Sequence, residues 1–204
     1  MIRMRYLMAI VSAAALAACA SAPVHYYTLI PASDGAPAET AASPAPFQFE
    51  LMPVGVPAQN DVPQLVVRQG GQAITPLNGE RWAAPLADEV RGALSVDLAR
   101  STRAQDISGG VAATGKPVLR IKVDLRRFDS SPGNYARIDA TWTVRELRSQ
   151  AVLTCSSQIS ESAGQGYAGL VAAHQQALSA LAGQIASVAP AMAAGSVSPA
   201  CPSP

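Results

Sequence analysis

The residue best placed for covalent chemistry is a cysteine near the start of the chain. Cys19 directly follows Leu16-Ala17-Ala18, and a basic start with Arg3 and Arg5 precedes an apolar run over residues 6–18. A run of this length is too short to cross a bilayer, because a spanning helix needs about 20 residues. A basic start, an apolar middle and small residues at the exit predict a secretory signal peptide.

The position of this cysteine resembles the lipobox of bacterial lipoproteins. In that pattern the thiol is the nucleophile that takes the lipid, for example palmitate, and Cys19 becomes the first residue of the mature chain. The signal peptide is then residues 1–18, and residues 19–23 form a lipidated tether. Ala20 stands where aspartate would retain the protein at the inner membrane, which favours the periplasmic face of the outer membrane. The alternative is an ordinary signal peptide with a coincidental cysteine.

Lipidation of the first cysteine would leave Cys155 and Cys201 as an even pair in an oxidising compartment. A disulfide between them is the simplest account, and it would hold the C-terminal tail against the domain. The alternative is two free thiols, because spacing alone does not show that the two residues meet. With only two histidines in the chain, these scattered residues predict no metal site.

Composition and motifs give no support to an enzyme or a nucleic-acid binder. The chain has 15 basic and 14 acidic residues, and loss of Arg3 and Arg5 leaves the mature chain with one net negative charge. Asp88 and Glu89 diverge by about 100° on a helix and therefore do not face one reacting bond. A serine nucleophile elbow and a phosphate-binding glycine loop are both missing from the sequence. No catalytic residue and no cofactor other than the covalent lipid are expected.

Short strands are predicted over the first half of the mature chain. Residues 24–30 and 47–51 have strand composition, and a flexible loop over residues 32–46 separates them. The runs at 64–69 and 72–77 flank Gly70-Gly71, which predicts a β-hairpin that Asn78-Gly79 ends.

A helix is predicted from Glu80 to about Arg100, since apolar residues recur there at four-residue steps. Pro85 would lie in its first turns, where a missing amide hydrogen costs least. The apolar stripe is Trp82, Leu86, Val90, Leu94 and Leu98, and the polar residues expected to face water are Arg81, Asp88, Glu89, Arg91 and Asp97.

The second half predicts a short strand over residues 102–107 and then a three-strand meander. Its strands, near residues 119–126, 135–147 and 151–159, alternate apolar and polar residues. A second helix with His174 on its apolar face follows and ends at Pro190. His174 is expected to be a packed core residue and His25 a surface residue.

Together these elements predict an α+β fold. Its sheet is mostly antiparallel and includes the three-strand meander, and the two amphipathic helices pack on one face. Residues 24–190 are expected to form a single periplasmic domain, and residues 191–204 a tail rich in proline and alanine.

Several segments of this sequence are similar to those of the ABC-type transport auxiliary lipoproteins, the PqiC-like group. The combination that carries most of the similarity is Tyr26-Tyr27-Thr28-Leu29 with Arg81-Trp82-Ala83-Ala84-Pro85-Leu86. The cysteines at 155 and 201 depart from the pattern. The other matching segments are Val54-Gly55-Val56-Pro57, Gln64-Leu65-Val66-Val67-Arg68, Arg127-Phe128-Asp129, Ala140-Thr141-Trp142 and Leu170-Val171-Ala172-Ala173.

The resemblance implies a non-enzymatic docking subunit in the outer membrane that works with an MCE-domain protein and, indirectly, with an inner-membrane permease and ATPase. Such systems move lipid or other hydrophobic cargo between the membranes and support envelope integrity. Self-association, for instance as a ring, is also expected. Arg81, Trp82 and Pro85 are the candidate interface residues, although Trp82 could equally be a core residue. The alternatives are a lipoprotein that assists barrel or lipopolysaccharide assembly, and a lipid-binding carrier.

Overall fold

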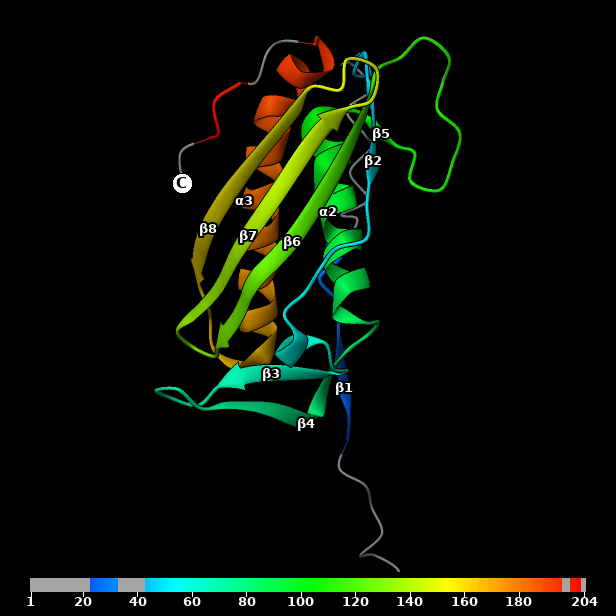
Figure 1. Cartoon of the computed structure of the whole chain (residues 1–204). Helices are drawn as coiled ribbons and strands as arrows, with labels where there is room; N and C mark the ends of the chain where they lie inside the picture. The colour runs from blue at the N-terminus through cyan, green and yellow to red at the C-terminus, as the bar shows by residue number, and fades with distance from the viewer. Residues whose placement is uncertain (1–22, 33–42, 196–198, 203–204) are drawn as a thin grey trace, which may run out of the picture.

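The computed structural model describes residues 23–32, 43–195 and 199–202, in which two β-sheets and two long helices surround one main apolar core (Figure 1). The predicted signal peptide, Cys19 and most of the predicted 32–46 loop lie outside the described residues. The elements in chain order are β1 (His25–Tyr27), β2 (Gln48–Leu51), the short 3-10 helix η2 (Ala58–Asn60), β3 (Gln64–Arg68), β4 (Ile74–Trp82), α2 (Leu86–Thr102), β5 (Gln105–Asp106), β6 (Val118–Ser131), β7 (Tyr135–Glu146), β8 (Val152–Ser162) and α3 (Gly166–Ala193).

The larger sheet has five strands in the order β5-β2-β6-β7-β8. The predicted meander is confirmed, since β6, β7 and β8 pair antiparallel in sequence order. β2 inserts between β5 and β6 and runs parallel to both. The fold is α+β as predicted, but the sheets are mixed and not mostly antiparallel. Alternation of apolar and polar residues cannot distinguish a parallel from an antiparallel neighbour for so short a strand.

The smaller sheet has three strands in the order β1-β4-β3 and lies at one end of the molecule (Figure 1). The predicted hairpin is confirmed, and Gly70 and Gly71 adopt the positive φ angles of 86° and 52° that its turn requires. However, β4 does not end at Asn78-Gly79. It continues to Trp82, because residues 80–82 pair in parallel with β1.

The first long helix begins at Leu86, six residues later than predicted, and ends at Thr102. Pro85 is its N-cap and does not lie within its first turns. The four-residue spacing from Trp82 to Leu86 therefore crosses a boundary between a strand and a helix. Pairing with β1 supplies backbone partners to residues 80–82 that a helix would otherwise have to provide.

The second long helix continues through Pro190 and ends three residues beyond the predicted end, at Ala193. A proline removes one helical hydrogen bond, and burial of Val188, Ala189 and Met192 on the same helix offsets that loss. α2 and α3 contact each other and lie side by side on one face of the larger sheet, as predicted (Figure 1). Among the described residues, no helix is both long and apolar enough to cross a bilayer.

The predicted solvent face of the first helix is wrong at two acidic residues. Glu89 and Asp97 are only 3% and 4% exposed. Burial raises the pKa of Asp97, and Arg100 one turn later opposes that rise. The Glu89 carboxylate accepts hydrogen bonds from the Thr28 hydroxyl at 2.7 Å and the Leu29 amide at 2.8 Å. Glu89 thus attaches the segment after β1 to the first turn of α2.

Replacing Glu89 by alanine is expected to lower the free energy of unfolding by about 1.5–3 kcal/mol, because the buried Leu29 amide loses its charged acceptor. Urea denaturation would measure this loss. Asp88→Ala is the matched control, since Asp88 is exposed in the same turn and shares the helix-dipole term. Equal losses for the two variants would show that the contact with residues 28 and 29 contributes nothing.

Candidate functional site

The three predicted interface residues lie where the small sheet joins α2, but they differ in exposure. Trp82 is the last residue of β4 and only 5% exposed, and its amide donates to the Pro63 carbonyl at 2.9 Å. Pro85 is exposed, and Arg81 is partly buried beside Tyr26 of β1. Within the described part of the chain, the Arg81 Nε atom is buried and has no hydrogen-bond partner. Trp82 is therefore a packing residue whose indole is almost wholly buried.

This tryptophan lies at the wall of a surface hollow of about 360 Å³. Ala83, Ala84 and Pro85 are exposed along it, and Trp82 and Leu86 are buried beneath. We call it the apolar hollow. Its lining residues are Asp61, Val62, Pro63, Trp82, Ala83, Ala84, Pro85 and Leu86.

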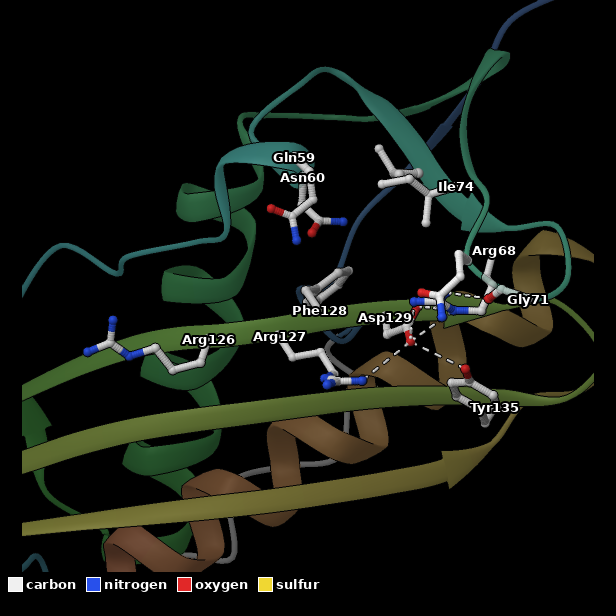
Figure 2. A pocket seen from close by; sticks show the side chains of 12 residues that line it. Gln59, Asn60, Arg68, Gly71, Ile74, Arg126, Arg127, Phe128, Asp129 and Tyr135 are labelled. Carbon is white, nitrogen blue, oxygen red and sulfur yellow. Dashed lines mark hydrogen bonds and ion pairs between the residues drawn. The ribbon is translucent and has the colours of Figure 1, made fainter.

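A second and larger hollow, of about 570 Å³, is polar and was not predicted from the sequence. Figure 2 shows it between η2 on one side and the outer face of β6 on the other, next to the β3–β4 hairpin. We call it the arginine groove. Its lining residues are Gln59, Asn60, Val66, Arg68, Gly71, Gln72, Ile74, Arg126, Arg127, Phe128, Asp129 and Tyr135.

A β-bulge in β6 creates the positive wall of this groove. The register with β7 shifts between Leu125, which faces Ala140, and Arg127, which faces Asp139. The extra residue is Arg126, so two consecutive arginines are exposed on the outer face. Two adjacent polar residues interrupting the alternation are the only sign of the bulge in the sequence.

Asp129 is the negative centre of the groove and is 7% exposed. Its carboxylate accepts from Arg68 Nε at 3.0 Å and Nη2 at 2.9 Å, and from the Tyr135 hydroxyl at 3.3 Å (Figure 2). Arg127 Nη1 lies 4.0 Å away, and Arg127 Nε pairs with Asp139 at 3.0 Å. The carboxylate raises the pKa of Arg68, which therefore stays charged. This pair links the hairpin to the end of β6.

An aromatic stack beneath the groove connects it to the apolar hollow. Trp82 and Phe128 are T-shaped to each other at a centroid distance of 6.1 Å, and Phe128 lies flat on the His174 ring at 3.9 Å. His174 is fully buried, which confirms the predicted core histidine, and its Nε2 lies 2.8 Å from the Ser130 hydroxyl. Burial lowers the pKa of His174 to about 3, although Asp129 opposes this, so the ring is neutral at pH 7.

The predicted cysteines lie away from this site. Cys155 on β8 and Cys201 in the tail form a disulfide with a Cα–Cα distance of 5.6 Å. Cys19 is outside the described residues. Among the residues that are described, no group of three or more His, Cys, Asp and Glu side chains is placed to hold a metal ion. The candidate site thus consists of two hollows, one lined mainly by apolar residues and one lined by three arginines and a carboxylate.

A family model described as the ABC-type transport auxiliary lipoprotein component matches residues 27–186. The chain belongs to this family. The match includes both surface hollows and all of the larger sheet. The family is described as a transport auxiliary lipoprotein component, and it therefore associates this chain with a transport system. No curated protein sequence matches the chain.

Solved structures share the fold of this family member. An uncharacterized protein is 16% identical with a TM-score of 0.63, over 81% of this chain and 98% of its own. Protein XCC0632 from Xanthomonas campestris, of the DUF330 family, is 21% identical with a TM-score of 0.52, over 73% and 85% of the two chains. The PelC dodecamer from Paraburkholderia phytofirmans is 11% identical over 70% and 88%, and its TM-score of 0.38 is too low to support an argument.

Proposed function

We propose that this auxiliary lipoprotein is the outer-membrane docking subunit of an MCE-type ABC transport system that carries lipid or other hydrophobic cargo between the membranes. The family match is the observation that carries the proposal. The lipobox at Cys19 supports anchoring, and Ala20 after it supports the outer membrane. The chain itself would catalyse nothing, and its only prosthetic group would be the lipid on Cys19.

The length of the tether limits where the domain lies. Pro23 is the first described residue, and the four steps from Cys19 to Pro23 span at most about 14 Å when fully extended. The described chain enters β1 at the end of the molecule that the small sheet forms (Figure 1). With Cys19 acylated, the small sheet would lie near the membrane and the larger sheet would extend into the periplasm.

The apolar hollow is the proposed docking point for the MCE-domain protein. Small exposed residues, Ala83 and Ala84, leave room beside Leu86 and Trp82 for an apolar side chain of the partner. The few side chains that dominate interface energies typically insert into well-packed pockets of this kind, so the anchor would come from the partner. Truncation of Trp82 would also disturb the core, so an exposed position gives the cleaner test.

Ala84→Glu is expected to weaken the complex with the MCE-domain protein about tenfold or more, because it places an unpaired charge in the hollow. The measurement is recovery of the MCE-domain protein and its ATPase from crosslinked envelopes with the tagged, acylated chain. Val111→Glu is the control, since Val111 is 93% exposed in the 108–115 loop and lies outside the hollow. Equal recovery with both variants would exclude the hollow as the docking point.

The same pull-down separates the alternatives. Recovery only of barrel-assembly or lipopolysaccharide-assembly proteins would contradict the transport role. Lipid retained by the mature chain without its acyl anchor would favour a carrier. Self-association as a ring remains a prediction, which light scattering of the purified mature chain would test.

A further inference from the structure

We propose that the arginine groove is a binding site for the phosphate group of a phospholipid headgroup in the membrane that holds the anchor. The inference rests on the anchoring part of the proposed function and assigns a ligand to a surface separate from the docking hollow. The mature chain carries one net negative charge, so a general attraction to an anionic membrane is not expected. A local site has to supply the contact.

The charges that line the groove favour an anion. Three guanidinium groups and a single carboxylate line it. The Arg126 side chain makes no hydrogen bond or ion pair with any other described residue, and its whole guanidinium is available. Arg68 uses three of its five N–H groups on Asp129 and the Gly71 carbonyl, and two remain for a ligand. Guanidinium forks match the geometry of phosphate oxygens.

A buried amide on the opposite wall favours a ligand that also carries a hydrogen-bond donor. Asn60 is 5% exposed, and its Oδ1 has no partner among the described residues. Figure 2 shows Asn60 on the η2 side of the groove, above Phe128 and across from the arginines. A headgroup with a hydroxyl next to its phosphate, such as that of phosphatidylglycerol, would bind the arginines through the phosphate and donate a hydrogen bond to Asn60 Oδ1 through the hydroxyl. Phosphatidylcholine has the phosphate but no such donor.

The position of the groove favours a membrane lipid over a soluble phosphate. Its hairpin wall belongs to the same small sheet as β1, which the short tether holds near the membrane. The first described residue, Pro23, lies beside Gly79 of β4. Its carbonyl oxygen is 3.5 Å from the point that a Cβ on Gly79 would occupy. Ile74 lies five residues from Gly79 along β4, a distance of about 17 Å. Ile74 is 43% exposed at the groove and offers an apolar contact below a headgroup.

Flotation with vesicles tests the proposal. The mature chain with Cys19→Ser, which removes the acyl anchor, is expected to bind phosphatidylglycerol vesicles and to bind phosphatidylcholine vesicles markedly less. Arg126→Gln is expected to weaken binding to phosphatidylglycerol about fivefold, since one cation near such a surface contributes about 1 kcal/mol. Arg126 is exposed, so the midpoint of thermal unfolding should not change.

Lys122→Gln is the matched control. It removes one positive charge from the outer face of the same strand, where Lys122 pairs with Asp124 at 3.1 Å outside the groove. Equal weakening by the two variants would overturn the proposal, because the attraction would then be diffuse. Equal binding of wild type to both kinds of vesicle would overturn it too.

Titration with glycerol 3-phosphate distinguishes the two sources of a phosphate. We expect glycerol 3-phosphate to bind weakly. Arg126→Gln should abolish this binding, and phosphatidylglycerol vesicles should compete with it. Saturation by glycerol 3-phosphate without competition from vesicles would make the ligand a soluble phosphate and overturn the lipid assignment. Neither experiment includes a transporter component. A lack of vesicle binding would therefore not contradict the docking role that the envelope pull-down tests. Equally, failure to recover a partner in that pull-down would not contradict the lipid site.

Discussion

Between pH 7 and pH 4.5 the free energy of unfolding is expected to fall by about 2–3 kcal/mol through His174 alone. The folded pKa of about 3 lies below the ordinary value of 6.5, so the unfolded chain binds the proton first. The stabilisation is complete above pH 6.5 and is lost progressively as the pH falls towards 3. Urea denaturation at a series of pH values measures it.

The two histidines of the chain provide the comparison. His174→Gln keeps a polar group near Ser130 but has no titrating ring. Between pH 7 and pH 4.5 the variant should therefore lose about 2–3 kcal/mol less of its free energy of unfolding than the wild type loses. His25→Gln is the control substitution, since it changes an exposed histidine that lies 3.2 Å from Glu80. An unchanged dependence in His174→Gln would mean that other groups cause the acid sensitivity.

Asp129→Ala is expected to lower the free energy of unfolding by about 2–3 kcal/mol, somewhat less than for a fully buried pair because Arg68 is 25% exposed. The substitution leaves Arg68 without its double hydrogen bond and Tyr135 without its acceptor. The hairpin would then lose its charged link to β6. Chemical denaturation gives the value.

Lys122→Ala breaks an exposed pair on the same strand, whose side chains are 62% and 33% exposed, and should cost at most about 1 kcal/mol. A double-mutant cycle of Arg68→Ala with Asp129→Ala isolates the pairwise term. Additive losses in that cycle would show that the two residues stabilise the fold independently of each other.

Strong local patterns were sufficient to predict most of the architecture. The meander alternates without ambiguity, and Gly70-Gly71 fixes the hairpin turn through its backbone angles. The α3 stripe predicts the burial of His174. Each of these features depends on residues close together in the sequence, where side-chain period and turn chemistry decide the structure.

The features that sequence reasoning missed depend on partners that are distant in the chain. Glu89 is a surface residue by helical period, and only Thr28 and Leu29, some 60 positions earlier, make its burial favourable. β1 converts residues 80–82 from a predicted helix start into strand. The arginine groove requires a bulge at Arg126 and a hairpin contact at Asp129, and neither follows from residue types alone. The structure places Arg81, Trp82 and Pro85 together where the small sheet joins α2. Their role as interface residues stays a prediction.

The disulfide also bears on the solubility of the domain. Among the strands that the structure describes, β8 with its 11 residues is an outer strand of the larger sheet, and a long strand at a sheet edge is a template on which a second chain can pair and aggregate. The opposite edge, β5, has only two residues and offers little to pair with. Cys201 fastens the tail to Cys155, the fourth residue of β8, and so places a covalently held segment beside the vulnerable strand. Proteins anchored to one membrane meet at high local concentration, and there an oxidised tail would protect each copy from its neighbours.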